Sequence, residues 1–136
     1  MGAVKAIPYR QTEFPPFPAV QIQLEHLLGA TEPIGAKIDT GASRTVVPTG
    51  LLECAGAIRT GRTATCRAYD GTPCTWPIYQ VTLRVVDVRW PQGVGREFER
   101  ALVLGIEGET EVLLGRDVLA AWCLHLDGPQ SRYSVE

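Results

Sequence analysis

Asp39 is the residue of this sequence best placed to do chemistry. It ends a short apolar stretch and is followed at once by Thr-Gly, in the run AKIDTGASRTVVP (36–48). A carboxylate at the end of a buried strand loses hydration, so it must be held by hydrogen bonds or used in a reaction. Gly41 relaxes the steric limit on the turn and leaves backbone N–H groups free to point at the carboxylate. The alternative is that Asp39 is an ordinary turn residue whose side chain bonds the nearby backbone.

A second run, VLLGRDVLAAW (112–122), places two apolar residues before a glycine that opens a predicted helix. Together the two runs resemble the active-site signatures of aspartic proteases, in the same order along the chain. The residues of the second signature are Leu113, Leu114, Gly115 and Arg116. Because so short a chain holds a single Asp-Thr-Gly, it resembles the retropepsin-like (retroviral-type) aspartic protease family rather than the two-lobed pepsin type.

The resemblance implies a homodimeric aspartic endopeptidase that acts on extended polypeptides with no metal and no cofactor. In this family two carboxylates share a proton, one activating a water and the other acting as an acid toward the substrate carbonyl. The second carboxylate would be Asp39 of another copy of the chain. Thr40 would brace the loop, and Gly41 and Ala42 would form the turn around the carboxylates.

The resemblance also implies a β-hairpin flap between the two signatures. The run CRAYDGTPCTWP (66–77) fits such a flap, with Asp70, Gly71 and Thr72 at its tip and Tyr69 beside the turn, where it would contact the substrate. Taken alone, this run would predict an ordinary surface hairpin. One position departs from the viral pattern, because Ser43 stands where an acid usually pairs with the arginine of the second signature. Arg116 therefore lacks that partner.

Hydrophobic periodicity predicts an all-β fold. Apolar and polar residues alternate in segments 19–28 and 79–90, as in strands with one buried face. Further short apolar segments bounded by Gly, Pro or Thr predict additional strands. We therefore expect a small closed β-barrel-like aspartic protease fold with one short C-terminal helix, in segment 115–122, and a flap hairpin. A single helical turn is also predicted in segment 49–56.

The domain organisation follows from proline content. The prolines of IPYRQTEFPPFP (7–18) disfavour a paired central strand, so residues 1–18 are expected to form an extended arm. Residues 19–136 are expected to form a single protease domain, because a segment of this length is an ordinary size for a domain with one hydrophobic core. The last residues, CLHLDGPQSRYSVE, predict a closing hairpin that turns at Asp127-Gly128.

Composition argues against several classes of partner. The net charge is −2 with acids and bases interspersed, so no nucleic-acid partner and no anionic membrane surface is expected. No apolar run reaches the roughly 20 residues of a membrane span. The first residues, MGAVKAIPYRQ, lack the apolar core of a signal peptide, so a cytoplasmic location is expected. The cysteines and histidines lack metal-ligand spacing, which favours reduced structural cysteines over zinc or disulfides.

Two other functions are considered for the same residues. A catalytically inactive module with this fold would serve in dimerisation or peptide binding, since a fold does not guarantee activity. A metal or aspartyl-phosphate hydrolase would need a second acid near Asp39 or a phosphate-binding loop, and neither is evident. Among the remaining acids, Asp117 is expected to cap the C-terminal helix. Asp87 and Asp127 are expected at an exposed strand position and at a turn.

Overall fold

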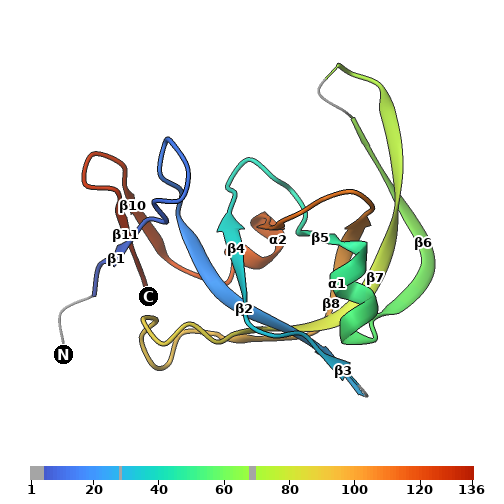
Figure 1. Cartoon of the computed structure of the whole chain (residues 1–136), viewed down its shortest axis with the longest axis horizontal. Coiled ribbons are helices and arrows are strands. Elements are labelled where there is room, and N and C mark those ends of the chain that lie inside the picture. Colours follow the sequence, from blue (N-terminus) through green and yellow to red (C-terminus); the bar gives the residue numbers. More distant parts are fainter. Residues whose placement is uncertain (1–4, 28, 68–69) are drawn as a thin grey trace.

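The centre of the molecule is a closed barrel of six strands (Figure 1). In this computed structural model, residues 5–27, 29–67 and 70–136 are described. Around the barrel the strands follow the order β2 (Ala19–His26), β4 (Ile34–Ile38), β9 (Val112–Leu114), β5 (Val46–Pro48), β8 (Glu97–Ile106) and β7 (Pro73–Val85). Pairing of β7 with β2 closes the ring. The short β3 (Gly29–Ala30) pairs with β2, and β6 (Ile58–Arg67) pairs with β7.

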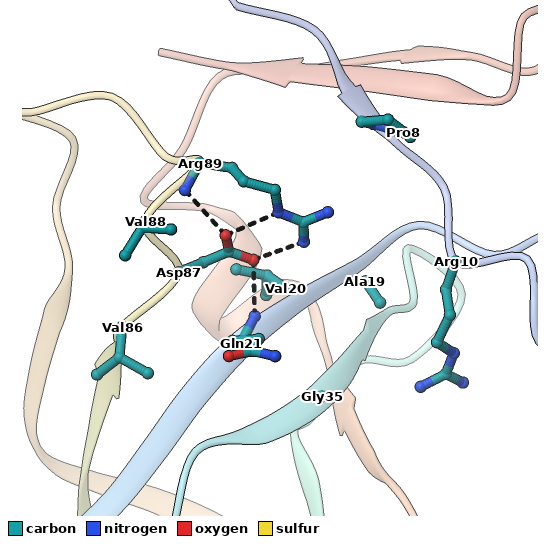
Figure 2. A pocket seen from close by; sticks show the side chains of 10 residues that line it. All are labelled: Pro8, Arg10, Ala19, Val20, Gln21, Gly35, Val86, Asp87, Val88 and Arg89. Carbon is teal, nitrogen blue, oxygen red and sulfur yellow. Dashed lines mark hydrogen bonds and ion pairs between the residues drawn. The ribbon is translucent and has the colours of Figure 1, made fainter.

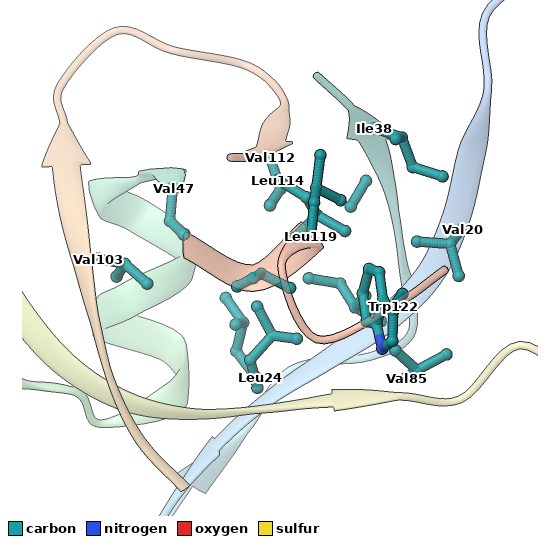
Figure 3. Packing of buried hydrophobic residues seen from close by; sticks show 14 of the residues in the cluster. Val20, Leu24, Ile38, Val47, Val85, Val103, Val112, Leu114, Leu119 and Trp122 are labelled. Atoms are coloured by element: carbon teal, nitrogen blue, oxygen red, sulfur yellow. The ribbon is translucent and has the colours of Figure 1, made fainter. Parts of the chain in front are cut away.

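Alternating side chains of β2 and β7 build the core, as the periodicity predicts. Val20, Ile22 and Leu24 of β2 are buried, and Val81, Leu83 and Val85 continue the same face on β7. Figure 3 shows Val20, Leu24 and Val85 in the barrel interior, in one cluster with labelled side chains of β9 and of the short helix α2 (Arg116–Leu119). β7 begins six residues earlier than predicted, because it runs without a break into a hairpin with β6. The predicted all-β barrel is confirmed.

Two helices accompany the barrel in the described part of the chain. α1 (Thr49–Ala55) is longer than the single predicted turn, because Leu52 and Ala55 pack into the core and Gly56 ends the helix in the left-handed conformation. α2 (Arg116–Leu119) is the predicted C-terminal helix. It stops before Trp122, whose indole N–H donates to the Gly95 carbonyl at 2.7 Å. In the described part of the chain, neither helix has the length and apolar character of a membrane span.

A separate three-stranded sheet joins the two ends of the chain. β11 (Arg132–Val135) lies between β1 (Ile7–Pro8) and β10 (Leu124–Asp127). The predicted closing hairpin is therefore formed by β10 and β11. Ile7 is fully buried in the common core although it belongs to the proline-rich segment. The division of the chain at residue 18 stays a prediction.

Two basic and two acidic side chains form ion pairs that connect the proline-rich segment to β4, the strand that leads to Asp39. Arg10 bonds Glu13 at 2.6 Å and Glu111 at 2.8 Å, and Lys37 of β4 bonds both carboxylates at 2.8 Å. Hydrogen bonding to the Lys37 ammonium, helped by Arg10, holds the pKa of Glu13 and of Glu111 below the ordinary value of 4.5. Lys37 also lies 4.5 Å from the centre of the Phe17 ring.

Acid is expected to weaken this cluster. Because the carboxylate pKa values are lower in the folded chain than in the unfolded chain, the stabilisation is present above about pH 4.5 and disappears as the pH falls through the lowered values. In urea unfolding, Lys37→Met should lower the midpoint at pH 7 and have much less effect near pH 3. Lys5→Met, at an exposed lysine, is the control. An equal effect of Lys37→Met at both pH values would contradict a role for the ion pairs.

Candidate active site

Asp39 follows β4 directly and begins a loop that crosses the end of β9. β9 lies between β4 and β5, pairing in parallel with β4 (Ile38 opposite Leu114) and antiparallel with β5 (Val46 opposite Leu113). The loop 39–45 therefore starts on one side of β9 and ends on the other. Three strands hold it in place, two of them adjacent in the sequence and the third more than 60 residues away.

The Asp39 side chain is half-buried and bound by its own turn. Its backbone N–H donates to the Leu114 carbonyl at 3.0 Å, and its Oδ1 accepts the Gly41 N–H at 3.0 Å. The Ala42 N–H donates a hydrogen bond to the Asp39 carbonyl at 3.2 Å. A side chain on Gly41 would bring its Cβ to 3.3 Å from Oδ1. In the described part of the chain, Asp39 Oδ2 accepts no hydrogen bond, so this oxygen is free for another group.

Arg116 holds the same loop from the other side. Its backbone N–H donates to the Ala42 carbonyl at 2.8 Å, and its guanidinium donates to the Thr40 carbonyl at 3.0 Å. Arg116 thus binds loop carbonyls where the viral pattern has an acid. Thr40 is exposed, and within the described residues its hydroxyl makes no hydrogen bond. Its predicted bracing role stays a prediction.

Gly115 is the point where the second run touches the loop most closely. A Cβ on Gly115 would lie 2.4 Å from the Arg44 carbonyl carbon and 2.6 Å from its oxygen. Only hydrogen fits at this contact. Leu114, the residue before, is fully buried, and Leu113 is half-buried. The two predicted runs therefore meet in space at Asp39–Ala42 and at Arg44.

Thr45 is a site residue that the sequence analysis missed. It is fully buried, and its hydroxyl donates to Asp117 Oδ1 at 2.8 Å while accepting the Gly115 N–H at 3.1 Å. Its backbone N–H donates to Asp117 Oδ2 at 3.0 Å. Asp117 also accepts the Val118 N–H at 2.9 Å. The predicted capping role is wrong, because Gly115 occupies the N-cap position without a side-chain capping hydrogen bond and Asp117 lies inside the first turn, where it fixes the end of the loop. A threonine between a loop and an apolar strand is too common to predict this network.

Replacing Thr45 by valine should destabilise the protein by about 2 kcal/mol, because the buried Gly115 N–H and one Asp117 oxygen lose a partner. Valine preserves the shape, so the effect isolates the hydroxyl. Equilibrium unfolding in urea measures it. Thr63→Val, at an exposed position of β6, is the control and should change stability by less than about 0.5 kcal/mol. Equal effects of the two substitutions would exclude the network as a source of stability.

The predicted hairpin between the two runs is formed by β6 and β7 and projects beyond the barrel (Figure 1). Asp70 Oδ1 accepts the Thr72 N–H at 2.9 Å, and Gly71 has a φ of +86°. Hydrogen bonding from Thr72 lowers the pKa of Asp70. Arg67 bonds the Gly71 carbonyl at 3.3 Å. Tyr69, predicted beside this turn, lies outside the described residues.

Comparison with solved structures identifies this architecture. A retropepsin-like aspartic protease from Rickettsia conorii aligns over 98% of this chain and 92% of its own, with a TM-score of 0.63 and 15% identity. The EIAV protease in complex with the inhibitor HBY-793 aligns over 84% and 92%, with a TM-score of 0.51 and 22% identity. The chain has the retropepsin fold. No family model and no curated protein matches the sequence.

A cavity of about 360 Å³ lies away from the Asp39 loop of this retropepsin fold, between β2 and the loop after β7 (Figure 2). The prediction that Asp87 is exposed is wrong, because its side chain is 3% exposed at this cavity. Burial raises the pKa of Asp87, but Arg89 and the Gln21 N–H bind both carboxylate oxygens and lower the pKa overall. Because these hydrogen bonds satisfy both oxygens of the buried carboxylate, we assign Asp87 a structural role.

Among residues 5–27, 29–67 and 70–136 of this retropepsin fold, no group of three His, Cys, Asp or Glu side chains is arranged to hold a metal ion. Cys54, Cys74 and Cys123 are free thiols. The loop 39–45 with Arg116 and Asp117 is therefore the candidate active site.

Proposed function

We propose that this protein is an aspartic endopeptidase that works as a homodimer, with one Asp39 from each subunit in a shared active site. The observation that supports it most is the Asp39 carboxylate itself. One oxygen is bound by the Gly41 N–H, and the other accepts no hydrogen bond within the described residues. Such a carboxylate is oriented but keeps a free oxygen for a water or a second carboxylate. The retropepsin fold supports the same assignment.

The proposed reaction uses the two carboxylates with one proton between them. The ionised Asp39 takes a proton from a water as that water attacks the carbonyl carbon of the peptide bond. The protonated Asp39 donates its proton to the carbonyl oxygen, giving a tetrahedral intermediate with two hydroxyl groups. The Asp39 that took the proton of the water then gives it to the peptide nitrogen while the other Asp39 removes a hydroxyl proton, so the C–N bond breaks to leave an amine and a carboxylic acid. Two carboxylates at contact cannot both ionise, which keeps one of them protonated.

The neighbouring residues take supporting roles in this proposal. Gly41 and Ala42 form the turn that presents the carboxylate, and Thr40 braces the loop in the dimer. The hairpin tip, with Tyr69, Asp70, Gly71 and Thr72, closes over an extended polypeptide and binds its backbone as an additional strand. The reaction as proposed needs no metal and no cofactor. Nucleic acid and membrane are not expected partners, and a cytoplasmic location stays a prediction.

An inactive module with the same fold is the alternative, serving in dimerisation or peptide binding. Digestion of casein, an unstructured protein, separates the two. The endopeptidase should cleave casein, and a statine-type inhibitor should stop the cleavage. Intact casein after long incubation at several acidic and neutral pH values would favour the inactive module.

Dilution should lower the specific activity, because the proposed site exists only between two chains. Sedimentation and peptide turnover measured over the same concentration range should change together. A monomer with full activity would contradict the shared site. Mixing wild-type protein with an excess of inactive Asp39→Asn chains should also reduce activity, since most wild-type subunits would then lie in mixed dimers.

A further inference from the structure

β6 carries three positively charged side chains that have no role in the proposed reaction. Three arginines, Arg59, Arg62 and Arg67, lie on β6, and the sequence has no acidic residue between Glu53 and Asp70. All three are exposed. Among the described residues none of them forms an ion pair. The whole chain has a net charge of −2, whereas β6 has a net positive charge.

β6 is also a free edge for strand pairing. It stands at the end of the sheet order and, within the described residues, pairs with β7 only. The register with β7 is regular from Thr63 to Arg67 and shifts between Arg59 and Thr63, where Gly61 has a φ of +82°. The backbone groups of an edge strand that point away from its neighbour are available to another extended chain.

We propose that this edge is a second binding site for substrate, which takes an extended acidic segment of the polypeptide that the Asp39 site cleaves. The segment would pair with residues 63–67 as an added strand, while carboxylates at its two ends meet Arg62 and Arg67 and a further one reaches Arg59. This inference rests on the proposed function. It adds a preference for substrates with acidic residues outside the cleaved bond.

An acidic peptide fits this edge better than a nucleic acid does. Strand pairing uses the N–H and C=O groups of the ligand, which a phosphate backbone does not have. The three arginines lie on one strand of a chain with negative net charge, whereas nucleic-acid binding requires a broad positive surface. Exposed arginines should attract the peptide mainly through their charge, so binding should weaken as the salt concentration rises.

Binding to the Asp39→Asn protein tests the site without any need for catalysis. Two labelled peptides share one sequence, with glutamates in one and glutamines at the same positions in the other. Fluorescence anisotropy should show the glutamate peptide binding about tenfold more tightly at low salt, with most of the difference lost near 0.5 M salt. Arg59→Gln/Arg62→Gln should reduce the preference to about twofold or less. Arg67 is kept because it bonds Gly71 in the turn.

A matched control is Arg100→Gln/Arg132→Gln, which removes two exposed charges elsewhere and should keep the preference. Equal binding of the two peptides, or an unchanged preference in Arg59→Gln/Arg62→Gln, would overturn the inference and leave the role of Asp39 untouched. Tighter binding of an oligothymidylate than of the glutamate peptide would overturn it as well. Casein that stays intact would instead refute the proposed function, whatever the binding result.

Discussion

Asparagine in place of Asp39 is expected to abolish proteolysis, with activity falling at least about a thousandfold. The substitution removes both catalytic carboxylates of the proposed dimer at once, and acid–base groups supply a large share of the rate. The fold should survive, because the asparagine Oδ1 can still accept the Gly41 N–H that binds Asp39. Turnover of a cleaved peptide and urea unfolding of the same preparations measure the two effects separately.

Asp39→Ala serves as the comparison for this experiment. It also removes the carboxylate, but it leaves the Gly41 N–H without its side-chain acceptor, so it should be equally inactive and less stable than Asp39→Asn. Activity of Asp39→Asn above about a thousandth of wild type would rule out Asp39 as the catalytic group. If Asp39→Asn were much less stable than wild type, unfolding would account for its loss of activity.

Alanine at Gly115 is expected to destabilise the protein by about 3 kcal/mol, because its Cβ would lie 2.4 Å from the backbone of Arg44. The backbone of Gly115 is extended, with φ −90° and ψ 178°, so alanine adopts it without strain. The effect therefore measures the contact alone. Relief of the overlap would move the loop that carries Asp39, so activity should fall as well.

Gly50→Ala is the matched control for this substitution. Gly50 lies in α1 with open space around it, and alanine there should stabilise the helix by up to about 1 kcal/mol. Urea unfolding of both variants at pH 7 compares them. A small effect of Gly115→Ala would show that the second run does not hold the Asp39 loop as closely as the contact indicates.

Periodicity was sufficient to predict much of the barrel. Each strand with one buried face alternates apolar and polar residues, so β2 and the second half of β7 were evident in the sequence. The first half of β7 was not, because Pro73 and Pro77 interrupt the pattern and residues 73–77 are exposed or half-buried. α1 was underestimated, since Thr49 and Gly50 are weak helix formers and the helix depends on burying Leu52.

Asp87 shows how a correct pattern can be misread. It continues the buried face of Val81, Leu83 and Val85, so the alternation itself indicated burial. A carboxylate at a buried position is rare without a partner, and its partner, Arg89, lies only two residues away. The Thr45–Asp117 network was harder to foresee, because it joins residues 72 positions apart and depends on how β9 and α2 pack.

The position of β9 between β4 and β5 also sets the order in which the protein can assemble. While the chain is being synthesised, Asp39 leaves the ribosome long before Leu114 and Arg116, the residues that hold its loop. Until those residues emerge, the loop has no partner strand, and contacts between distant segments form late in folding. A nascent chain that ends before residue 112 therefore carries the carboxylate without the contacts that hold its loop, and the proposed activity can arise only after residues 112–116 have been synthesised.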